Sequence, residues 1–326
     1  MSPEELDGHG TPNSLAPAAA GAPARSAKRL PLVSIVIPVL NEEKNLEALL
    51  EEIVETLMQV QGFLFEILVI DDGSSDRSSE ISRSMDARVV THPVNLGNGA
   101  AVKRGIREAR GDWILLMDGD GQHPPSVIPE LLEKSKAWDM VVASRGGSGG
   151  SLHRNLANRI YNGLASYVTG MKIPDLTSGF RIARADALQG FVTLLPNTFS
   201  YPTTITLAMI KSGYAVSFHP FEVRGRHGLS KINLLRDGSR FLLIIVKLAT
   251  FTAPLKVFLP VSFSIGALGL VWYVYTYLTT QRFTNMAVLL LVQASVIFAL
   301  GLISEQVAQL RFERTGPASD EPSKKQ

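Results

Sequence analysis

The sequence predicts an α/β fold, with a mostly parallel, doubly wound sheet in residues 31–231 and a pair of membrane-spanning helices after it. Short apolar runs alternate there with segments that have the apolar periodicity of helices, which indicates parallel strands joined by helices. Polar clusters follow the ends of several of these runs, where ligands bind in such sheets. Two long uncharged runs near the C-terminus predict the membrane helices.

The elements are expected in a regular order from residue 32. The run LVSIVIPV is short, apolar and β-branched, which is typical of a buried strand, and a helical apolar pattern follows it. This unit of strand and helix recurs twice, and two further strands come after it. The expected strands are 32–39, 65–70, 88–91, 113–117 and 140–143, and the expected helices are 45–60, 74–84 and 99–110.

Residues 1–30 are expected to be a flexible tail. They are rich in Ala, Pro, Gly and Ser and have few large apolar side chains, so they cannot repay the entropy lost on ordering. The segment also has no apolar run of the kind that a signal peptide contains.

The uncharged runs 257–278 and 286–304 are predicted to form a transmembrane hairpin. At about 1.5 Å per residue the first run is roughly 33 Å long, enough to cross a bilayer core of about 30 Å. A buried helical pair in a large soluble core is the alternative. Basic residues lie before the first run and after the second, and only Arg282 lies in the linker between them. By the positive-inside rule, both termini, including the tail 311–326, are expected in the cytoplasm. The flanking residues are Lys231, Arg236, Arg240, Lys247, Lys256, Arg311, Arg314, Lys324 and Lys325.

The stretch 232–256 mixes apolar residues with widely spaced basic ones, as interfacial amphipathic helices do on anionic lipid headgroups. An ordinary docking helix of the soluble domain is the alternative. The formal net charge of +2, from 32 Lys and Arg against 30 Asp and Glu, argues against nucleic acid as a partner. Because the chain has no cysteine, a bound metal would need oxygen or imidazole ligands.

Acidic or amide side chains follow three of the expected strands. Carboxylates that converge in one crevice repel each other unless a cation lies between them, and oxygen ligands favour Mg²⁺ or Mn²⁺. An ion that carries a diphosphate is the expected occupant. The residues are Asn41 and Glu42 after the first strand, Asp71 and Asp72 after the second, and Asp118, Asp120 and Gln122 in LMDGDGQHPP after the fourth.

Other interpretations of LMDGDGQHPP are open from the residues alone. The Asp-Gly pairs by themselves are compatible with an ordinary turn. An EF-hand is excluded, because His123, Pro124 and Pro125 stand where that loop needs a glycine and then a bidentate Glu. The two prolines keep the loop from continuing as a strand. His123 is either a neighbour of the metal ligands or a structural hydrogen-bonding residue.

A second polar cluster lies in residues 145–231. Arginine and lysine gathered around a site for a metal and a diphosphate suggest further phosphate recognition. For Lys231 the alternative is a flanking charge of the membrane helices. The cluster contains Arg145, Arg154, Asp175, Arg181 and the run from Arg224 to Lys231, which includes Arg226.

Six motifs together resemble the GT-A glycosyltransferases of family 2, and among them the polyprenol-phosphate glycosyltransferases typified by dolichol-phosphate mannose synthase. The motifs are SIVIPVLNEE, VIDDGSSD, NLGNGAA, MDGDGQHPP, DLTSGFR and GLSK, in family order. The two C-terminal runs are similar to those of members that carry their own membrane anchor. The resemblance implies a Rossmann-like GT-A domain and single-sugar transfer, since the QxxRW motif of processive synthases is absent.

The resemblance also implies roles for individual residues. Pro38, Glu42 and one or both of Asp71 and Asp72 would hold the base and ribose of a nucleotide sugar. Asp118, Asp120 and Gln122 would bind the metal ion that bridges the donor diphosphate. Arg145, Arg154, Ser230 and Lys231 would lie near the donor or acceptor phosphate, and Asp175 beside the reacting centre. Catalysis itself would fall to Asp120, Asp175, Arg226 and Lys231.

The chain departs from the family pattern at two positions. The family usually shows Arg-x-x-Gly-x-Ser-Lys, but Gly225 stands at the arginine position, with Arg224 and Arg226 on either side as the two candidates for phosphate contact. A lysine often stands where this chain has Asn98.

The reaction that the resemblance implies is metal-dependent inverting transfer from GDP-mannose or a UDP-hexose to a polyprenyl phosphate. A phosphate monoester has a second pKa of about 6, so it needs no strong base, and Asp175 is expected to orient a group instead. The expected location is the cytoplasmic face of a membrane, in bacteria the inner one, with lipid as a partner and with homo-oligomers left open. The alternatives are a transferase that acts on a glycolipid or lipid-linked saccharide hydroxyl, and a non-catalytic membrane scaffold.

Overall fold

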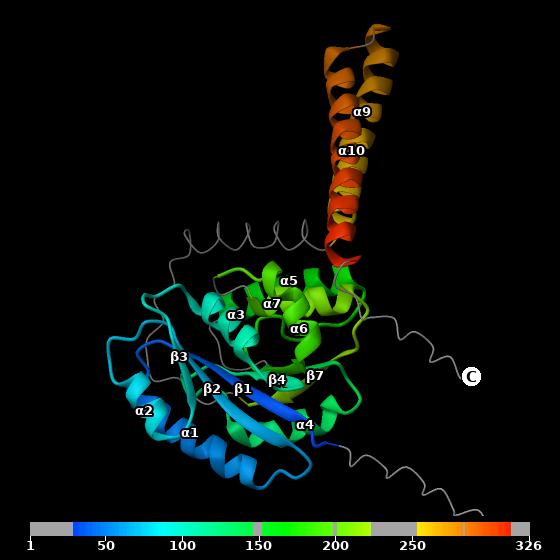
Figure 1. Cartoon of the computed structure of the whole chain (residues 1–326). Helices are drawn as coiled ribbons and strands as arrows, with labels where there is room; N and C mark the ends of the chain where they lie inside the picture. Colours follow the sequence, from blue (N-terminus) through cyan, green and yellow to red (C-terminus); the bar gives the residue numbers. More distant parts are fainter. Residues whose placement is uncertain (1–28, 146–151, 198–200, 223–252, 283, 314–326) are drawn as a thin grey trace, which may run out of the picture. The chain divides into compact units, whose positions relative to one another are not determined.

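The computed structural model describes residues 29–145, 152–197, 201–222, 253–282 and 284–313 (Figure 1). Within these residues, seven strands form a sheet in the order β3-β2-β1-β4-β6-β5-β7. The pairs β1–β2, β1–β4, β2–β3 and β5–β7 are parallel, and only β6 runs antiparallel to both of its neighbours. The prediction of a mostly parallel α/β sheet is therefore confirmed. The strands are β1 Leu32–Val39, β2 Leu64–Asp71, β3 Arg88–Thr91, β4 Trp113–Leu116, β5 Met140–Arg145, β6 Arg181–Arg184 and β7 Val216–Phe221.

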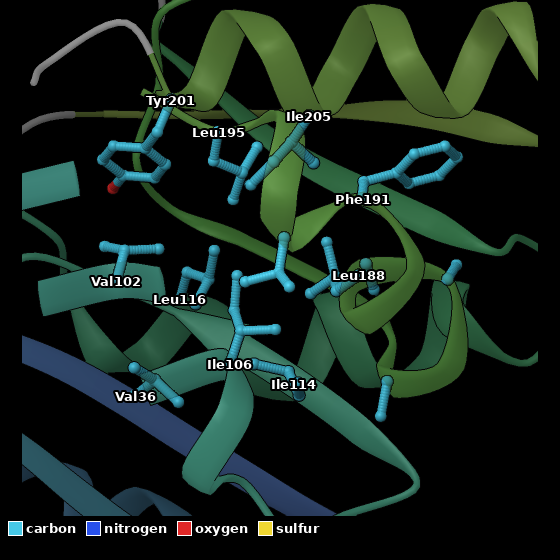
Figure 2. Close-up of a cluster of buried hydrophobic side chains, with 14 of the residues drawn as sticks. Val36, Val102, Ile106, Ile114, Leu116, Leu188, Phe191, Leu195, Tyr201 and Ile205 are labelled. Carbon is cyan, nitrogen blue, oxygen red and sulfur yellow. The ribbon is translucent and has the colours of Figure 1, made fainter. Parts of the chain in front are cut away.

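Helices cover both faces of this sheet because the side chains of each strand alternate between the faces. On β1, Ile35 and Ile37 join a buried cluster with helices α1 and α4, whereas Val36 joins a second cluster with α3, α6 and α7. Figure 2 shows the second cluster, with Val36 of β1 below Ile106 of α3. The helices of this domain are α1 Glu43–Met58, α2 Ser78–Ser84, α3 Asn98–Glu108, α4 Ile128–Ser135, α5 Leu152–Thr169, α6 Ala185–Phe191 and α7 Tyr201–Lys211.

A glycine brings α3 unusually close to the sheet. A Cβ at Gly105 would lie 2.2 Å from Cγ1 of Val36, so the helix packs against β1 at a distance that alanine does not allow. Because α3 begins at Asn98, this packing also sets the position of that side chain at the edge of the sheet.

The expected elements agree with the observed ones to within a few residues, with one larger difference at α2. We expected a helix from residue 74, but α2 begins at Ser78. Residues 74–77 form a loop instead, because the backbone N–H of Ser74 donates to Oδ1 of Asp71 at 2.8 Å. The strands β6 and β7 and the helices from α4 to α7 were not predicted.

The two C-terminal helices are α9 (Pro254–Thr280) and α10 (Asn285–Glu313), and they contain both expected spans. Their mean hydropathy in the most apolar window is 1.9 and 2.6, and only 11% and 17% of those windows is buried. A buried core pair would be covered, so the exposure favours the membrane interpretation over the soluble alternative. By length and composition both helices could cross a membrane.

Side-chain contacts hold the two helices of this hairpin together. The Ser262 hydroxyl donates to the carbonyl oxygen of Ala294 at 2.9 Å, and the backbone N–H of Leu255 donates to Oε2 of Glu305 at 3.0 Å. Gly269 gives the helices a close approach, because a Cβ there would lie 2.9 Å from Cβ of Leu290. Small residues and interhelical hydrogen bonds of this kind are what packs helices in a membrane.

Several predicted segments lie outside the described residues. They are the N-terminal tail up to residue 28, residues 223–252 with most of the expected interfacial stretch, and the C-terminal tail from residue 314. The last part of the expected interfacial stretch, from Pro254 on, already belongs to α9.

Candidate active site

The carboxyl ends of β1, β2 and β4 meet at one edge of the sheet, because these strands are parallel neighbours. The three acidic clusters of the sequence follow these ends, as predicted. Pro38 lies in β1, and a Cβ at Gly119 would lie 3.2 Å from its carbonyl oxygen. The turn that carries Asp118 and Asp120 therefore packs directly against the end of β1.

The aspartates after β2 organise the loops of this edge. Asp72 accepts hydrogen bonds from the backbone N–H of Leu96 at 2.9 Å and of Gly97 at 2.8 Å, and it pairs with Nδ1 of His92 at 2.7 Å. Both carboxylate oxygens of Asp72 are thus used to hold the loop that leads into α3. A contact of either Asp71 or Asp72 with base or ribose stays a prediction.

Hydrogen bonds join the loop after β1 to the loop after β2. Asn41 has a left-handed backbone (φ 57°), and its Oδ1 accepts from the backbone N–H of Ser75 at 2.8 Å. The backbone N–H of Glu42 donates to the Ser78 hydroxyl at 2.9 Å, and its carboxylate accepts from the Asn45 side chain at 3.0 Å. These contacts fix the place of Glu42 at the edge.

Asp118 lies where the loops after β3 and β4 meet. Its Oδ1 is buried and has no hydrogen-bond partner among the described residues. Burial raises the pKa of Asp118 above its ordinary value, while the Asn98 side chain and the positive charges of Arg145 and Arg181 act in the opposite direction. A carboxylate of this kind is stabilised by a cation that reaches its open oxygen.

The rest of the triplet is organised by its own short loop. Gln122 donates its backbone N–H to Oδ1 of Asp120 at 3.1 Å, and its side-chain amide donates to Oδ2. His123 accepts the backbone N–H of Asp118 on Nδ1 at 3.1 Å and stacks on Phe180 with ring centroids 5.1 Å apart. Burial lowers the pKa of His123 to about 4, so the ring is neutral at pH 7. His123 thus makes a structural hydrogen bond, and it also lies beside Asp118, with Nε2 3.9 Å from Oδ2, so its place next to the metal ligands stays a prediction.

The donor set fits a hard divalent cation. Asp118 has a buried oxygen that no other described residue bonds, and Asp120 supplies a second carboxylate two residues away. The described residues contain no group of three or more His, Cys, Asp or Glu side chains that would hold a metal by themselves. Mg²⁺ is commonly held by one or two carboxylates together with substrate phosphates, so a two-carboxylate site of this kind suits an ion that arrives with a diphosphate.

Arg145 and Asp175 form an ion pair with two side-chain bonds. Nε of Arg145 donates to Oδ2 at 2.7 Å, Nη2 donates to Oδ1 at 2.9 Å, and the backbone N–H of Arg145 adds a bond of 3.1 Å. Thr177 adds its own backbone N–H to Oδ1 of Asp175 at 3.0 Å. Burial alone would raise the pKa of Asp175, but these donors and the arginine charge hold it below its ordinary value. Asp175 is therefore an anion that holds Arg145 in one orientation.

Arg181 lies beneath this pair and is completely buried. Its guanidinium donates to the carbonyl oxygens of Pro202 at 2.8 Å and of Ser178, and to the Thr206 hydroxyl at 2.9 Å. Burial lowers its pKa to about 10, so it keeps its charge at neutral pH. Arg181 thus joins β6 to α7 and adds a fixed positive charge behind the site, rather than a contact with a phosphate.

Two residues near Asp118 were not predicted as site residues. A Cβ at Gly179 would lie 2.8 Å from Oδ2 of Asp118 and 3.2 Å from the hydroxyl oxygen of Tyr201. Tyr201 stands next to a proline in a largely apolar stretch, which predicts core packing alone. The proximity of Gly179 to Asp118 joins segments about sixty residues apart, which no local pattern reveals.

Other predicted site residues cannot be placed. Arg224, Arg226, Ser230 and Lys231 lie outside the described residues. Arg154 falls near the start of α5, but its side chain is not among those described.

Known families match both parts of the chain. Residues 34–191 match the family described as glycosyl transferase family 2, and residues 253–310 match the GtrB C-terminal hairpin. An undecaprenyl-phosphate 4-deoxy-4-formamido-L-arabinose transferase of Pectobacterium carotovorum subsp. carotovorum (strain PC1) is 30% identical over 85% of this chain and 88% of its own length. A dolichol-phosphate mannosyltransferase of Pyrococcus furiosus is 36% identical over 56% of this chain and 53% of its own.

A solved structure is similar in fold. Glucosyl-3-phosphoglycerate synthase from Mycobacterium tuberculosis, crystallised with Mn²⁺ and UDP-glucose, superposes with a TM-score of 0.53. The match covers 67% of this chain and 78% of that one, at 20% sequence identity. At this identity the likeness concerns the fold alone, which is the GT-A arrangement that the motifs imply.

Proposed function

Because the chain belongs to glycosyl transferase family 2 and is a glycosyltransferase, we propose that it transfers one sugar from a nucleotide sugar to a polyprenyl phosphate. Two relatives support this proposal by their names, which are undecaprenyl-phosphate 4-deoxy-4-formamido-L-arabinose transferase and dolichol-phosphate mannosyltransferase. The observation that carries the proposal is the arrangement at the sheet edge, where Asp118 has an open buried oxygen and Arg145 is fixed in place by Asp175.

Asp118, Asp120 and Gln122 would hold Mg²⁺ or Mn²⁺. When bound, such an ion neutralises the negative charge that grows on the departing nucleoside diphosphate. The chain contributes a turn whose oxygen atoms are ordered in advance, since Gln122 bonds both oxygens of Asp120 and His123 holds the backbone of Asp118. Preorganised groups of this kind lose little entropy when the reaction begins.

Arg145 suits a phosphate group of the donor or acceptor. Nε and Nη2 of its guanidinium bond Asp175, and Nη2 also bonds the Thr177 hydroxyl. No hydrogen bond joins the third nitrogen, Nη1, to another of the described residues, so it can donate to a phosphate oxygen from a fixed direction. The acceptor phosphate is already largely anionic at cytoplasmic pH, so Asp175 has no proton to remove and acts by orienting Arg145. Attack by the phosphate oxygen on the face opposite the leaving group inverts the anomeric centre.

The apolar hairpin explains why the acceptor is a lipid. An isoprenoid keeps its chain in the bilayer and presents its phosphate at the surface. The basic residues that flank α9 and α10 support a cytoplasmic site with both termini on the same side, by the positive-inside rule. The proposed place is accordingly the cytoplasmic face of the membrane, the inner one in a bacterium.

The test is an acceptor comparison with the purified full chain in detergent. Radiolabelled GDP-mannose, UDP-glucose and other nucleotide sugars are supplied with undecaprenyl phosphate, with dephosphorylated undecaprenol, or with a lipid-linked saccharide. We expect one donor to label undecaprenyl phosphate and not undecaprenol. Transfer only to the saccharide would instead show a hydroxyl acceptor, and absence of metal-dependent nucleotide binding would indicate a scaffold.

A further inference from the structure

The backbone of Gly179 passes close to two polar groups of the candidate site. A Cβ added at Gly179 would lie 2.8 Å from Oδ2 of Asp118, 3.2 Å from Oδ1 of Asp118 and 3.2 Å from the hydroxyl oxygen of Tyr201. The carboxylate and the phenol hydroxyl therefore both lie beside the position that a side chain at residue 179 would occupy. Only glycine fits at this position without a shift of these groups.

Tyr201 combines a core position with a polar end at the site. It is the first residue of α7 and 2% exposed, and its ring belongs to the buried cluster with Val102 and Leu195. Figure 2 shows the ring beside these two side chains, with the hydroxyl oxygen at the edge of the group. A buried tyrosine hydroxyl normally needs a hydrogen-bonding partner.

The hydroxyl of Tyr201 keeps its proton. A phenol has an ordinary pKa of about 10, so it is neutral at neutral pH. A neutral phenol beside a carboxylate is a hydrogen-bond donor, and the carboxylate can only accept.

We propose that Tyr201 is a positioning residue for metal binding, whose hydroxyl donates to the Asp118 carboxylate directly or through one water molecule. The inference rests on the proposed function, in which Asp118 is a metal ligand. It gives Asp118 a fixed orientation that leaves Oδ1, the oxygen without a partner, for the cation. Partners of this kind orient a ligand before the metal arrives, and their loss commonly weakens metal binding 10–100-fold.

The chain offers a matched control for this role. Tyr161 is also a buried tyrosine, 4% exposed, and its hydroxyl donates to the Thr203 hydroxyl at 3.0 Å. It belongs to a different cluster, with Ile173 and Leu176. Tyr201→Phe and Tyr161→Phe each remove one buried hydroxyl and keep the ring, but only the first removes a group that faces Asp118.

The experiment measures Mn²⁺ binding to the full chain in detergent, with UDP or GDP present, from the loss of the free Mn²⁺ resonance signal. We expect Tyr201→Phe to raise the Mn²⁺ dissociation constant about tenfold. Tyr161→Phe should leave it within about twofold, and both variants should unfold at similar temperatures without Mn²⁺. Wild-type affinity in Tyr201→Phe, or an equal loss in both variants, would overturn the role of Tyr201.

The same titration separates this inference from the proposed function. Asp120→Ala should abolish Mn²⁺ binding. If Asp120→Ala binds as tightly as the wild type, or the wild type does not bind, the metal site itself is wrong and the inference fails with it. If Asp120→Ala loses binding but Tyr201→Phe does not, the metal site stands and only the role of Tyr201 is refuted.

A second variant, at Gly179, perturbs the same pair of groups and can be used if Tyr201→Phe does not fold. Gly179→Ala places a methyl group 2.8 Å from Oδ2 of Asp118 and 3.2 Å from the Tyr201 hydroxyl oxygen, so it should also raise the Mn²⁺ dissociation constant at least tenfold. Gly163→Ala is its control, because a Cβ at Gly163 would meet nothing within 4 Å. Unchanged affinity in Gly179→Ala would contradict the proposed contact.

Discussion

Replacing Asp175 by asparagine tests whether this residue holds Arg145 or removes a proton. The change keeps the shape of the side chain but removes the charge and one of the two acceptor oxygens. In the wild type, Arg145 donates to these oxygens through Nε at 2.7 Å and Nη2 at 2.9 Å. We expect Asp175→Asn to loosen Arg145 and to slow transfer moderately.

The size of the effect follows from the geometry of the pair. Hydrogen bonds to charged groups contribute about 1.5–3 kcal/mol each. The side chain of Arg145 is 33% exposed, so water weakens the pair and the lower end applies. With one acceptor oxygen of Asp175 retained, one side-chain bond to Arg145 is lost, at about 1.5 kcal/mol. This corresponds to roughly tenfold in transfer if it is expressed in the reaction.

The assay is a double-mutant cycle in sugar transfer to polyprenyl phosphate. If Asp175 acts through Arg145, the variant with both Arg145→Ala and Asp175→Asn should be no slower than the slower single variant. A loss above about a thousandfold in Asp175→Asn, multiplied further by Arg145→Ala, would refute the positioning role and indicate a proton acceptor.

The pH dependence of stability provides a second check on the same pair. The pKa of Asp175 is lowered in the folded protein, so its contribution is complete above the unfolded value of about 4 and is lost as the pH falls through the folded value. Thermal unfolding should thus separate Asp175→Asn from the wild type at pH 7, and the difference should narrow below pH 4.

Two further predictions concern stability. Gly105→Ala should lower the unfolding temperature by an amount equivalent to about 1–3 kcal/mol, because its Cβ would lie 2.2 Å from Cγ1 of Val36. The control, Gly163→Ala, should not lower it, because a Cβ at Gly163 would meet nothing within 4 Å. Equal unfolding temperatures of the two variants would contradict the packing of α3. Stability should also fall between pH 6.5 and pH 4, because the pKa of His123 is about 4 when folded and about 6.5 when unfolded, so the unfolded chain takes up the proton. The loss is about 3 kcal/mol at pH 4, and His123→Gln should remove it; an unchanged pH profile in that variant would show that His123 is not buried as a neutral ring.

Local patterns were sufficient for the first half of the fold. The run Leu32–Val39 is apolar at nearly every position because β1 lies in the middle of the sheet and is covered on both faces, and this made it recognisable. By contrast, β6 has the sequence RIAR, whose first arginine is completely buried by partners on α7. A four-residue segment with an arginine at each end lacks the apolar run that predicts a buried strand. The antiparallel position of β6 between β4 and β5 could therefore not be predicted.

In the candidate site too, local sequence patterns predicted some residues and missed the contacts that depend on the fold. Asp118 and Asp120 were found because their carboxylates directly follow a strand. That Arg145 and Asp175 bond each other depends on the return of the chain through β6, which brings residues thirty positions apart together. Tyr201 was missed because its ring is a core side chain and only its hydroxyl reaches the site.

The most direct test of the account is metal-dependent transfer to undecaprenyl phosphate by the wild type and by Asp120→Ala. Both proteins are assayed in detergent with the active nucleotide sugar over a range of Mn²⁺ and Mg²⁺ concentrations, after equal unfolding temperatures without metal confirm that both are folded. We predict that wild-type transfer requires the metal and that Asp120→Ala loses transfer at every concentration. Transfer by Asp120→Ala with the metal dependence of the wild type would contradict the account.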